Sequence, residues 1–276
     1  MKILFTTFLL FSLSFGQVLA QEKILFSNVY SANKEYIKET LSTNENQTLF
    51  TGSPDFLNYL KTKEIANPKI EKSESTMKMA YRIGTLKDSS YPIEVEYIET
   101  GTKDEYDALK NGDKVTGTYS TDGKINFTDI SSKSMNADYK NEFLKFFEYG
   151  ISSELFKGKM MSIGDTLLSY APLSIPFAGI QVTLIVSTSY KLKAIEKDLA
   201  YFDIIQEYKI GAEMKEISFI ANGNGTGSCV YDIKNQHIIS SKSETAIQLK
   251  KELEKNIQME INIISKSISS AKISKL

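Results

Sequence analysis

Two side chains in the sequence could do acid–base or nucleophilic chemistry, and each residue type occurs once. His237 is the only histidine and Cys229 the only cysteine among the 276 residues. A serine triad would have to use His237, but no Gly-x-Ser-x-Gly motif accompanies it. A zinc site built on histidine and cysteine needs more ligands than the chain has. We therefore predict a non-enzymatic protein with no catalytic residue, no metal site and no cofactor.

The surroundings of these two residues favour structural roles. His237 follows a predicted turn at Lys234-Asn235-Gln236, which indicates an exposed, ordinary histidine. Cys229 alternates with Tyr231 and Ile233 on a predicted strand, as a buried small hydrophobic residue would. Neither position has a neighbouring partner that would make it a base or a nucleophile.

A glycine-rich segment, Gly223-Asn224-Gly225-Thr226-Gly227, invites comparison with a phosphate-binding loop. It lacks the Lys-Ser/Thr ending of a P-loop, and it runs into a strand-like segment rather than a helix whose amides could face an anion. We interpret it as a strand edge or a β-bulge.

Binding chemistry is indicated most strongly by an aromatic helix. Between residues 138 and 156 the apolar positions recur every three or four residues, which predicts an amphipathic helix of about five turns. Phe143, Phe147 and Ile151 lie on its apolar face. These side chains could simply pack on a sheet, or they could form the floor of a ligand cavity. A shorter helix is expected from Asp55 to Lys63.

The second candidate for binding is a segment without charge. No Asp, Glu, Lys or Arg occurs from Thr166 to Tyr190. Two prolines four residues apart argue against a helix here, so we expect residues 170–177 to form an apolar, proline-bent loop. If this loop is exposed, it would contact a ligand, a partner or a membrane. If it is buried against the sheet, it is part of the core. The ligand-binding candidates in this loop are Tyr170, Leu173, Ile175 and Phe177.

Most of the remaining chain predicts antiparallel strands with one wet face. Apolar and polar residues alternate over residues 77–83, 91–97, 190–194, 200–204 and 257–263. Asp122-Gly123 between two such runs predicts a hairpin turn. The pentapeptide at 130–134 recurs at 239–243, so residues 76–134 and 185–243 are candidates for an internal repeat of one β unit.

The N-terminus predicts export. Lys2 precedes an uncharged, largely apolar run from Ile3 to Phe15, and small residues ending at Ala20 stand before Gln21. This order is typical of a secretory signal peptide at 1–20, which leaves one β-rich domain at 21–276 in the periplasm or the medium. The apolar run is shorter than the roughly 20 residues that a spanning helix needs. We therefore expect a mature chain with no transmembrane span. A formal net charge of −1 gives no reason to expect a nucleic-acid partner.

The order of these features resembles known exported proteins. A helix, then Gly164-Asp165-Thr166, long alternating strands and a glycine-rich strand ending in Tyr231-Asp232 resemble uncharacterised exported β proteins of Gram-negative bacteria. In outline they are similar to the periplasmic lipoprotein-carrier fold, in which a curved antiparallel sheet wraps a helix around an apolar cavity. The resemblance implies a binding protein.

We therefore expect an α+β fold, a curved antiparallel sheet of two similar β units packed on the helix at 138–156. The expected function is binding of an apolar ligand such as a lipid, a lipidated partner or an envelope protein. The alternative is a secreted structural or interaction protein, an assembly, adhesion or immunity factor without a ligand cavity.

Overall fold

The computed structural model of the chain describes residues 22–101, 109–121, 123–132, 135, 137–177, 180–210, 219–254 and 256–276. Within these ranges a few side chains, those of Ile175 and Phe177 among them, are outside the description. The expected signal peptide also lies outside the described residues.

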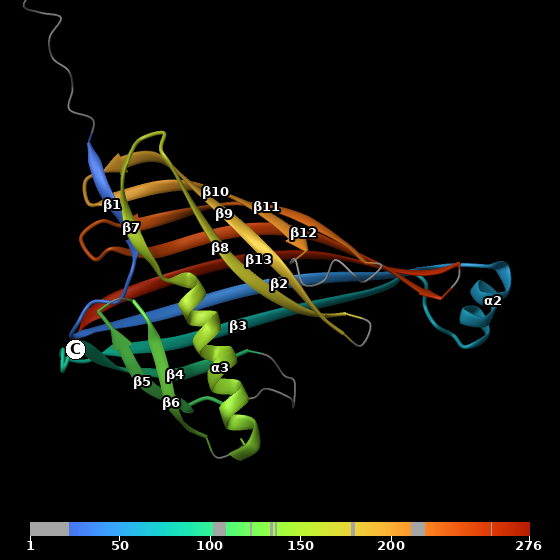
Figure 1. Ribbon diagram of the computed structural model, residues 1–276, viewed down its shortest axis with the longest axis horizontal. Coiled ribbons are helices and arrows are strands. Elements are labelled where there is room, and N and C mark those ends of the chain that lie inside the picture. The colour runs from blue at the N-terminus through green and yellow to red at the C-terminus, as the bar shows by residue number, and fades with distance from the viewer. Residues whose placement is uncertain are drawn as a thin grey trace, which may run out of the picture.

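Eleven strands form one antiparallel sheet, in the order β6-β5-β4-β3-β2-β13-β12-β11-β10-β9-β8, and β1 and β7 pair separately (Figure 1). The strands are β1 (Lys23–Asn28), β2 (Lys34–Thr51), β3 (Lys69–Ile83), β4 (Ser90–Thr100), β5 (Lys114–Ser120), β6 (Ile125–Ser131), β7 (Phe156–Ser162), β8 (Thr166–Phe177), β9 (Ile180–Glu196), β10 (Leu199–Ile210), β11 (Phe219–Asp232), β12 (His237–Glu254) and β13 (Ile257–Lys275). Within the large sheet, neighbouring strands are consecutive in the chain except where β2 pairs with β13, so the last strand of the chain joins two meanders into one sheet.

The alternation in the sequence predicted these strands correctly, because a half-buried strand must place every second side chain in the core. On β10 the buried Ala200, Phe202 and Ile204 alternate with more accessible residues. The predicted hairpin is β5–β6. Its turn has Gly123 at a φ of 91° and closes with a hydrogen bond from Gly123 N to Ser120 O.

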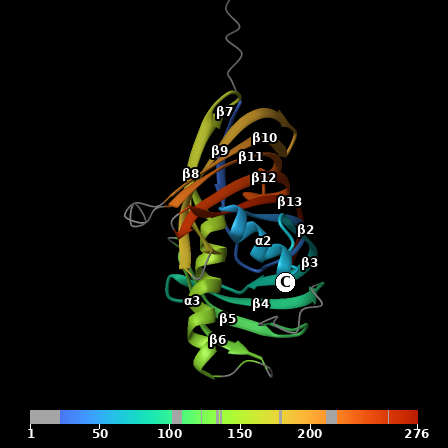
Figure 2. The ribbon, with the colours of Figure 1, turned by 90° about the vertical axis from the view of Figure 1, so that its right-hand side faces the viewer.

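The sheet curls so that its two edge strands approach opposite sides of helix α3 (Ala137–Glu154), as Figures 1 and 2 show from two directions. Lys140 Nζ donates to the carbonyl of Ile130 in β6 over 2.8 Å, and Glu148 Oε2 accepts from Phe127 N of the same strand over 3.3 Å. Tyr149 donates its hydroxyl to the carbonyl of Pro172 in β8 over 2.8 Å. Helix α3 thus lies across the seam between the edges.

The expected α+β class is wrong, although both predicted helices are present. In the part of the chain that the structure describes, strands make up 71% and the two helices are short. The aromatic face of α3 packs into only one cluster of the sheet, where Phe147 stands 5.1 Å from Phe127 and 6.0 Å from Tyr97 between ring centroids. The fold is therefore a large antiparallel sheet with a helix at its seam, not a sheet wrapped around a helix.

The second helix, α2 (Pro54–Thr62), begins as its sequence predicts. Ser53 is its N-cap and accepts a hydrogen bond from Phe56 N, and Pro54 occupies the first turn, where its missing N–H is not needed. The helix lies at the far end of a long projection from the sheet, beside the ends of β2 and β3 (Figure 1). Neither helix in the described ranges is long and apolar enough to cross a membrane.

Strand β8 replaces the loop that we expected at residues 170–177, and the prolines explain the error. β8 is the last strand of the sheet, and the carbonyl of Pro172 points away from β9 because it accepts from Tyr149. In an antiparallel ladder the N–H and C=O of one residue point to the same side. The missing N–H groups of Pro172 and Pro176 therefore face the free edge, where prolines are tolerated and block pairing with other chains.

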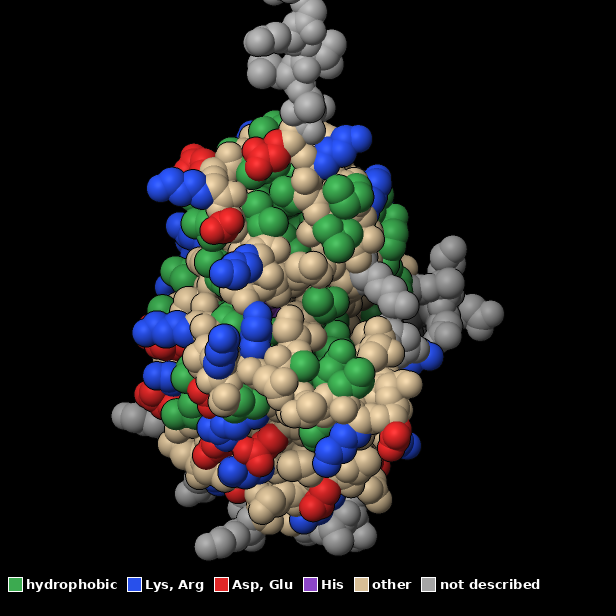
Figure 3. Space-filling view, turned by 90° about the vertical axis from the view of Figure 1, so that its left-hand side faces the viewer, with side chains coloured by type: hydrophobic (Ala, Val, Ile, Leu, Met, Phe, Trp, Pro, Cys, Tyr) green, Lys and Arg blue, Asp and Glu red, His purple; other side chains and the backbone are tan. Residues whose placement is uncertain are grey.

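Three apolar clusters line the inner face of the curved sheet, and ion pairs occupy its outer face. The first cluster joins α3 to β2–β6, the second joins β1 and β7 to β9–β11, and the third lies toward the other ends of β8–β13. On the outer face Arg82 binds Glu35, Glu94 and Glu96 at 2.8, 2.8 and 2.5 Å. In Figure 3 charges of both signs are interspersed over the visible end of the molecule rather than gathered by sign.

The two segments of the suggested repeat fall in corresponding parts of the two meanders, β3–β6 and β9–β12. This correspondence gives the repeat no support, because any antiparallel meander would place its strands in the same way. The duplication stays a prediction.

Candidate functional site

An unbroken row of residues without apolar or charged side chains crosses the inner face of the sheet. It is formed by positions that pair directly with one another on eight successive strands. These are Ser169, Thr188, Gln206, Gly225, Thr245, Ser265, Asn44 and Ser73, on β8, β9, β10, β11, β12, β13, β2 and β3. Inner faces of sheets are normally apolar, so this row sets the middle of the sheet apart from the clusters beside it.

Two neighbouring rows extend the polar surface over β12, β13, β2 and β3. Together with the polar side chains of the first row they form what we call the hydroxyl strip. Its members are Thr40, Ser42, Asn44, Ser73, Ser75, Ser169, Thr188, Gln206, Ser241, Ser243, Thr245, Ser265, Ser267 and Ser269. All but the exposed Ser73 are partly buried, while the outer residues between them, such as Lys242 and Glu244, are exposed. The strip therefore faces inward and is still reached by solvent.

Hydrogen bonds order part of the strip. Ser241 and Ser269 share a hydrogen bond of 2.7 Å between their hydroxyls, and Ser265 donates to Asn44 Oδ1 over 2.6 Å. At the other side the Tyr208 hydroxyl donates to Gln206 Oε1 over 3.2 Å, and Gln206 Nε2 donates to Thr188 Oγ1 over 3.4 Å. Because Ser, Thr, Asn and Gln both donate and accept, the strip offers both kinds of group to a ligand.

Burial acts on the tyrosine that anchors this network. It raises the pKa of Tyr208 above the usual value, although a hydrogen bond with Thr245 acts in the opposite direction. Tyr208 stays neutral at physiological pH, so its hydroxyl hydrogen remains available for Gln206.

Gly225 creates room within the row. A Cβ atom at this position would stand 2.7 Å from Thr245 Cγ2 and 3.0 Å from Gln206 Oε1. Both distances are too short for ordinary contact, so a side chain here would push apart the groups that the network aligns. The glycine-rich segment is a strand, as expected, but a central one that pairs with β10 and β12 along its length, not a sheet edge.

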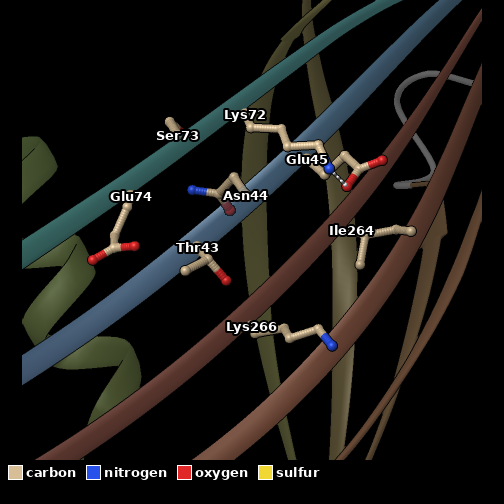
Figure 4. A pocket seen from close by; sticks show the side chains of 8 residues that line it. All are labelled: Thr43, Asn44, Glu45, Lys72, Ser73, Glu74, Ile264 and Lys266. Atoms are coloured by element: carbon tan, nitrogen blue, oxygen red, sulfur yellow. Dashed lines mark ion pairs between the residues drawn. The ribbon is translucent and has the colours of Figure 1, made fainter.

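A cleft of about 350 Å³ lies beside the strip on β2, β3 and β13, as Figure 4 shows. It is lined by two residues of the strip, Asn44 and Ser73, and by Thr43, Glu45, Lys72, Glu74, Ile264 and Lys266. Lys72 pairs with Glu45 at 2.9 Å and Lys266 with Glu244 at 3.3 Å, and all four side chains are well exposed. Exposed pairs of this kind contribute at most about 1 kcal/mol, and their arrangement offers no catalytic group.

The structure brings some of the predicted ligand-binding residues together. Phe143, Phe147 and Ile151 lie in the first apolar cluster, whereas Leu173 packs against the third. Tyr170 lies on the same strand as Leu173 and is 67% exposed. The side chains of Ile175 and Phe177 lie outside the description.

The apolar-ligand hypothesis is therefore corrected, because its aromatic floor is filled by its own packing and its loop is an edge strand. A flat exposed apolar patch over a solid core would favour the alternative, a secreted structural or interaction protein without a ligand cavity. That alternative is not supported either.

The two chemically suggestive residues are both buried. Cys229 is 3% exposed, as predicted, and burial raises its pKa to about 12, so it stays a thiol. His237 is 7% exposed, so its expected exposure was wrong. It packs 4.7 Å from Tyr36 between ring centroids, and its Nδ1 lies 3.3 Å from the carbonyl of Val29. His237 thereby ties the end of β1 to the start of β12.

The sequence contains a signal for the strip that we did not use. On β12 the segment from Ser241 to Thr245 alternates hydroxyl residues with Lys242 and Glu244, and β13 repeats the pattern around Lys266. Such a segment looks polar on both faces, so a search for apolar periodicity passes over it. The alternation of uncharged with charged polar residues would have identified the inward face.

Comparisons with known proteins give no family. No family model and no curated protein sequence matches the chain. Among solved structures, the outer membrane protein OprG from Pseudomonas aeruginosa aligns with 6% identity over 90% of this chain and 99% of its own, at a TM-score of 0.22. Ail, the attachment invasion locus protein of Yersinia pestis, aligns with 4% identity over 84% and 97%, at a TM-score of 0.14. Likeness at this level carries no argument about mechanism.

At TM-scores of 0.22 and 0.14 neither structure tests the predicted location or the outline of the lipoprotein-carrier fold, so both stay predictions. The expectation of a mature chain without a transmembrane span is corrected. It rested on the length of apolar helical runs, and that length does not bear on a chain made mostly of strands.

Proposed function

We propose that this protein binds a neutral carbohydrate on the hydroxyl strip, without catalysis. The observation that carries the proposal is the unbroken row of pairing inner positions, from Ser169 to Ser73, that has neither an apolar nor a charged side chain. A charged ligand would find no opposite charge on this row. An apolar ligand would remove water from the hydroxyls of the row without replacing the hydrogen bonds, which costs free energy of binding.

A polyhydroxylated ligand suits both the chemistry and the spacing of the strip. Sugars present hydroxyls that donate and accept, as do the side chains of the strip. Successive strands place these side chains about 4.8 Å apart across the sheet, a spacing comparable to the repeat of an extended glycan. Paired groups such as Ser241 with Ser269, and Ser265 with Asn44, are already aligned, which lowers the entropy that a ligand must overcome.

The two residues with the most obvious catalytic chemistry, Cys229 and His237, support a binding role rather than an enzyme. Cys229 is buried and stays protonated, and His237 is held between the ends of two strands. Neither belongs to the strip. We place the binding event outside the cytoplasm, on the strength of the signal-like N-terminus at residues 1–20.

Isothermal titration of the mature protein tests the proposal. Neutral oligosaccharides, such as maltoheptaose and chitohexaose, are expected to bind with a dissociation constant below about 1 mM. Oligogalacturonate, a charged glycan of similar length, should bind at least about tenfold more weakly, because its carboxylates lose hydration without gaining a cation on the strip. Binding of the charged glycan alone, or of no glycan in the series, would contradict the proposal.

A further inference from the structure

The sheet does not close on itself, so its two edge strands leave a seam beside the inner face. Each of the other strands of the sheet is hydrogen-bonded to two neighbours, whereas β6 and β8 are the two ends of the order. Helix α3 lies between these ends in both views of the ribbon (Figures 1 and 2). The seam therefore has two halves, one between α3 and β6 and one between α3 and β8.

The half at β6 is firmly packed. Phe147 and Ile151 are buried in the first apolar cluster, and Phe147 contacts the ring of Phe127 from β6. Lys140 and Glu148 bind backbone groups at the edge of β6. Opening this half would expose core side chains, which is costly.

The half at β8 is held differently. A hydrogen bond of 2.8 Å from the Tyr149 hydroxyl to the carbonyl of Pro172 in β8 crosses this half of the seam. Tyr149 is 43% exposed, so solvent competes for this bond. Pro172 and Pro176 remove backbone donors from the same edge, so the strand offers fewer groups by which the helix could hold it.

We infer that the contact between Tyr149 and Pro172 is a latch, and that the ligand of the hydroxyl strip enters between α3 and β8 when the latch opens. The biological purpose of this device rests on the proposed function. Its mechanics do not, because opening and closing need no ligand. Ser169 and Thr188, the outermost members of the strip on this side, lie on β8 and its neighbour β9. A ligand entering at the seam would meet these two residues first.

Thiol labelling measures the opening directly. In a Cys229→Ala background, Thr245→Cys places a reactive thiol on the strip, and a small uncharged maleimide reports how often the inner face is reached. Tyr149→Phe removes the latch hydroxyl and should raise the labelling rate roughly two- to tenfold, the effect of losing one intramolecular hydrogen bond. Tyr59→Phe, which removes an exposed tyrosine hydroxyl on α2, away from the seam, should leave the rate unchanged.

A second thiol position distinguishes opening of the seam from a general destabilisation of the sheet. Glu244→Cys lies on the outer face beside Thr245, so its labelling should be equal with and without the latch. The latch is overturned if Tyr149→Phe leaves the Thr245→Cys rate unchanged, or if it accelerates both positions alike. If the rate rises at Thr245→Cys alone while no glycan binds, the entry route stands and only the carbohydrate proposal fails.

Discussion

Phe202→Glu is expected to prevent the protein from folding. Phe202 is 1% exposed, and its ring stacks on Phe26 with 4.0 Å between centroids. Replacing it removes a buried aromatic side chain, at a cost of about 3 to 5 kcal/mol, and leaves a carboxylate among apolar rings without a partner. The sum approaches the whole stability of an ordinary domain, about 5 to 15 kcal/mol. Circular dichroism and a urea melt would measure the loss.

The matched control is Ile205→Glu, three residues away on the same strand. Ile205 points outward and is 56% exposed, so the same carboxylate should change the free energy of unfolding by no more than about 0.5 kcal/mol. Equal damage from the two substitutions would show that the inner and outer faces have been assigned wrongly.

Ser243→Leu with Ser267→Leu is expected to weaken glycan binding at least about tenfold while the protein stays folded. The two serines pair directly across β12 and β13 on the strip. Two leucines there would fill the surface and remove two hydroxyls, each worth about 0.5 to 1.5 kcal/mol as a hydrogen-bonding group. The dissociation constant should rise at least tenfold in titration. The melting temperature should hold or increase, because leucine adds apolar burial.

Glu244→Leu with Lys266→Leu is the control for this pair. These residues are one position further along the same two strands, pair with each other in the same way, and face outward. The substitution places two leucines on the outer face instead of the inner face, so binding should be unchanged. If the outer pair weakens binding and the inner pair does not, the ligand lies on the other face of the sheet.

The inner and outer faces of single strands could be predicted from the sequence where apolar and polar residues alternate. Alternation in segments such as Ala200 to Ile204 identifies strands because burial of every second side chain is a local property. The helices were likewise visible, α3 from its apolar spacing and α2 as the shorter helix expected from Asp55 to Lys63. Each of these signals lies within one element, so no knowledge of pairing is needed.

The strip could not be derived in the same way, because it depends on register. Asn44 meets Ser265 across 221 positions of sequence, and a slip of one residue in that pairing would turn every side chain of β13 to the other face. The edge role of Pro172 was hidden for a related reason. A proline in a strand is acceptable only on a free edge, and which strand is the edge follows from the order of the whole sheet.

The central claim is that the ligand lies on the inner hydroxyl strip, and protection of single thiols tests it most directly. Ser243→Cys and Glu244→Cys, each in the Cys229→Ala background, place a thiol on the inner and outer face of β12 at adjacent positions. With a saturating neutral oligosaccharide, labelling of Ser243→Cys by an uncharged maleimide should slow at least about tenfold. Labelling of Glu244→Cys should keep its rate. Protection of Glu244→Cys instead, or of neither position under conditions where titration shows the glycan bound, would contradict the account.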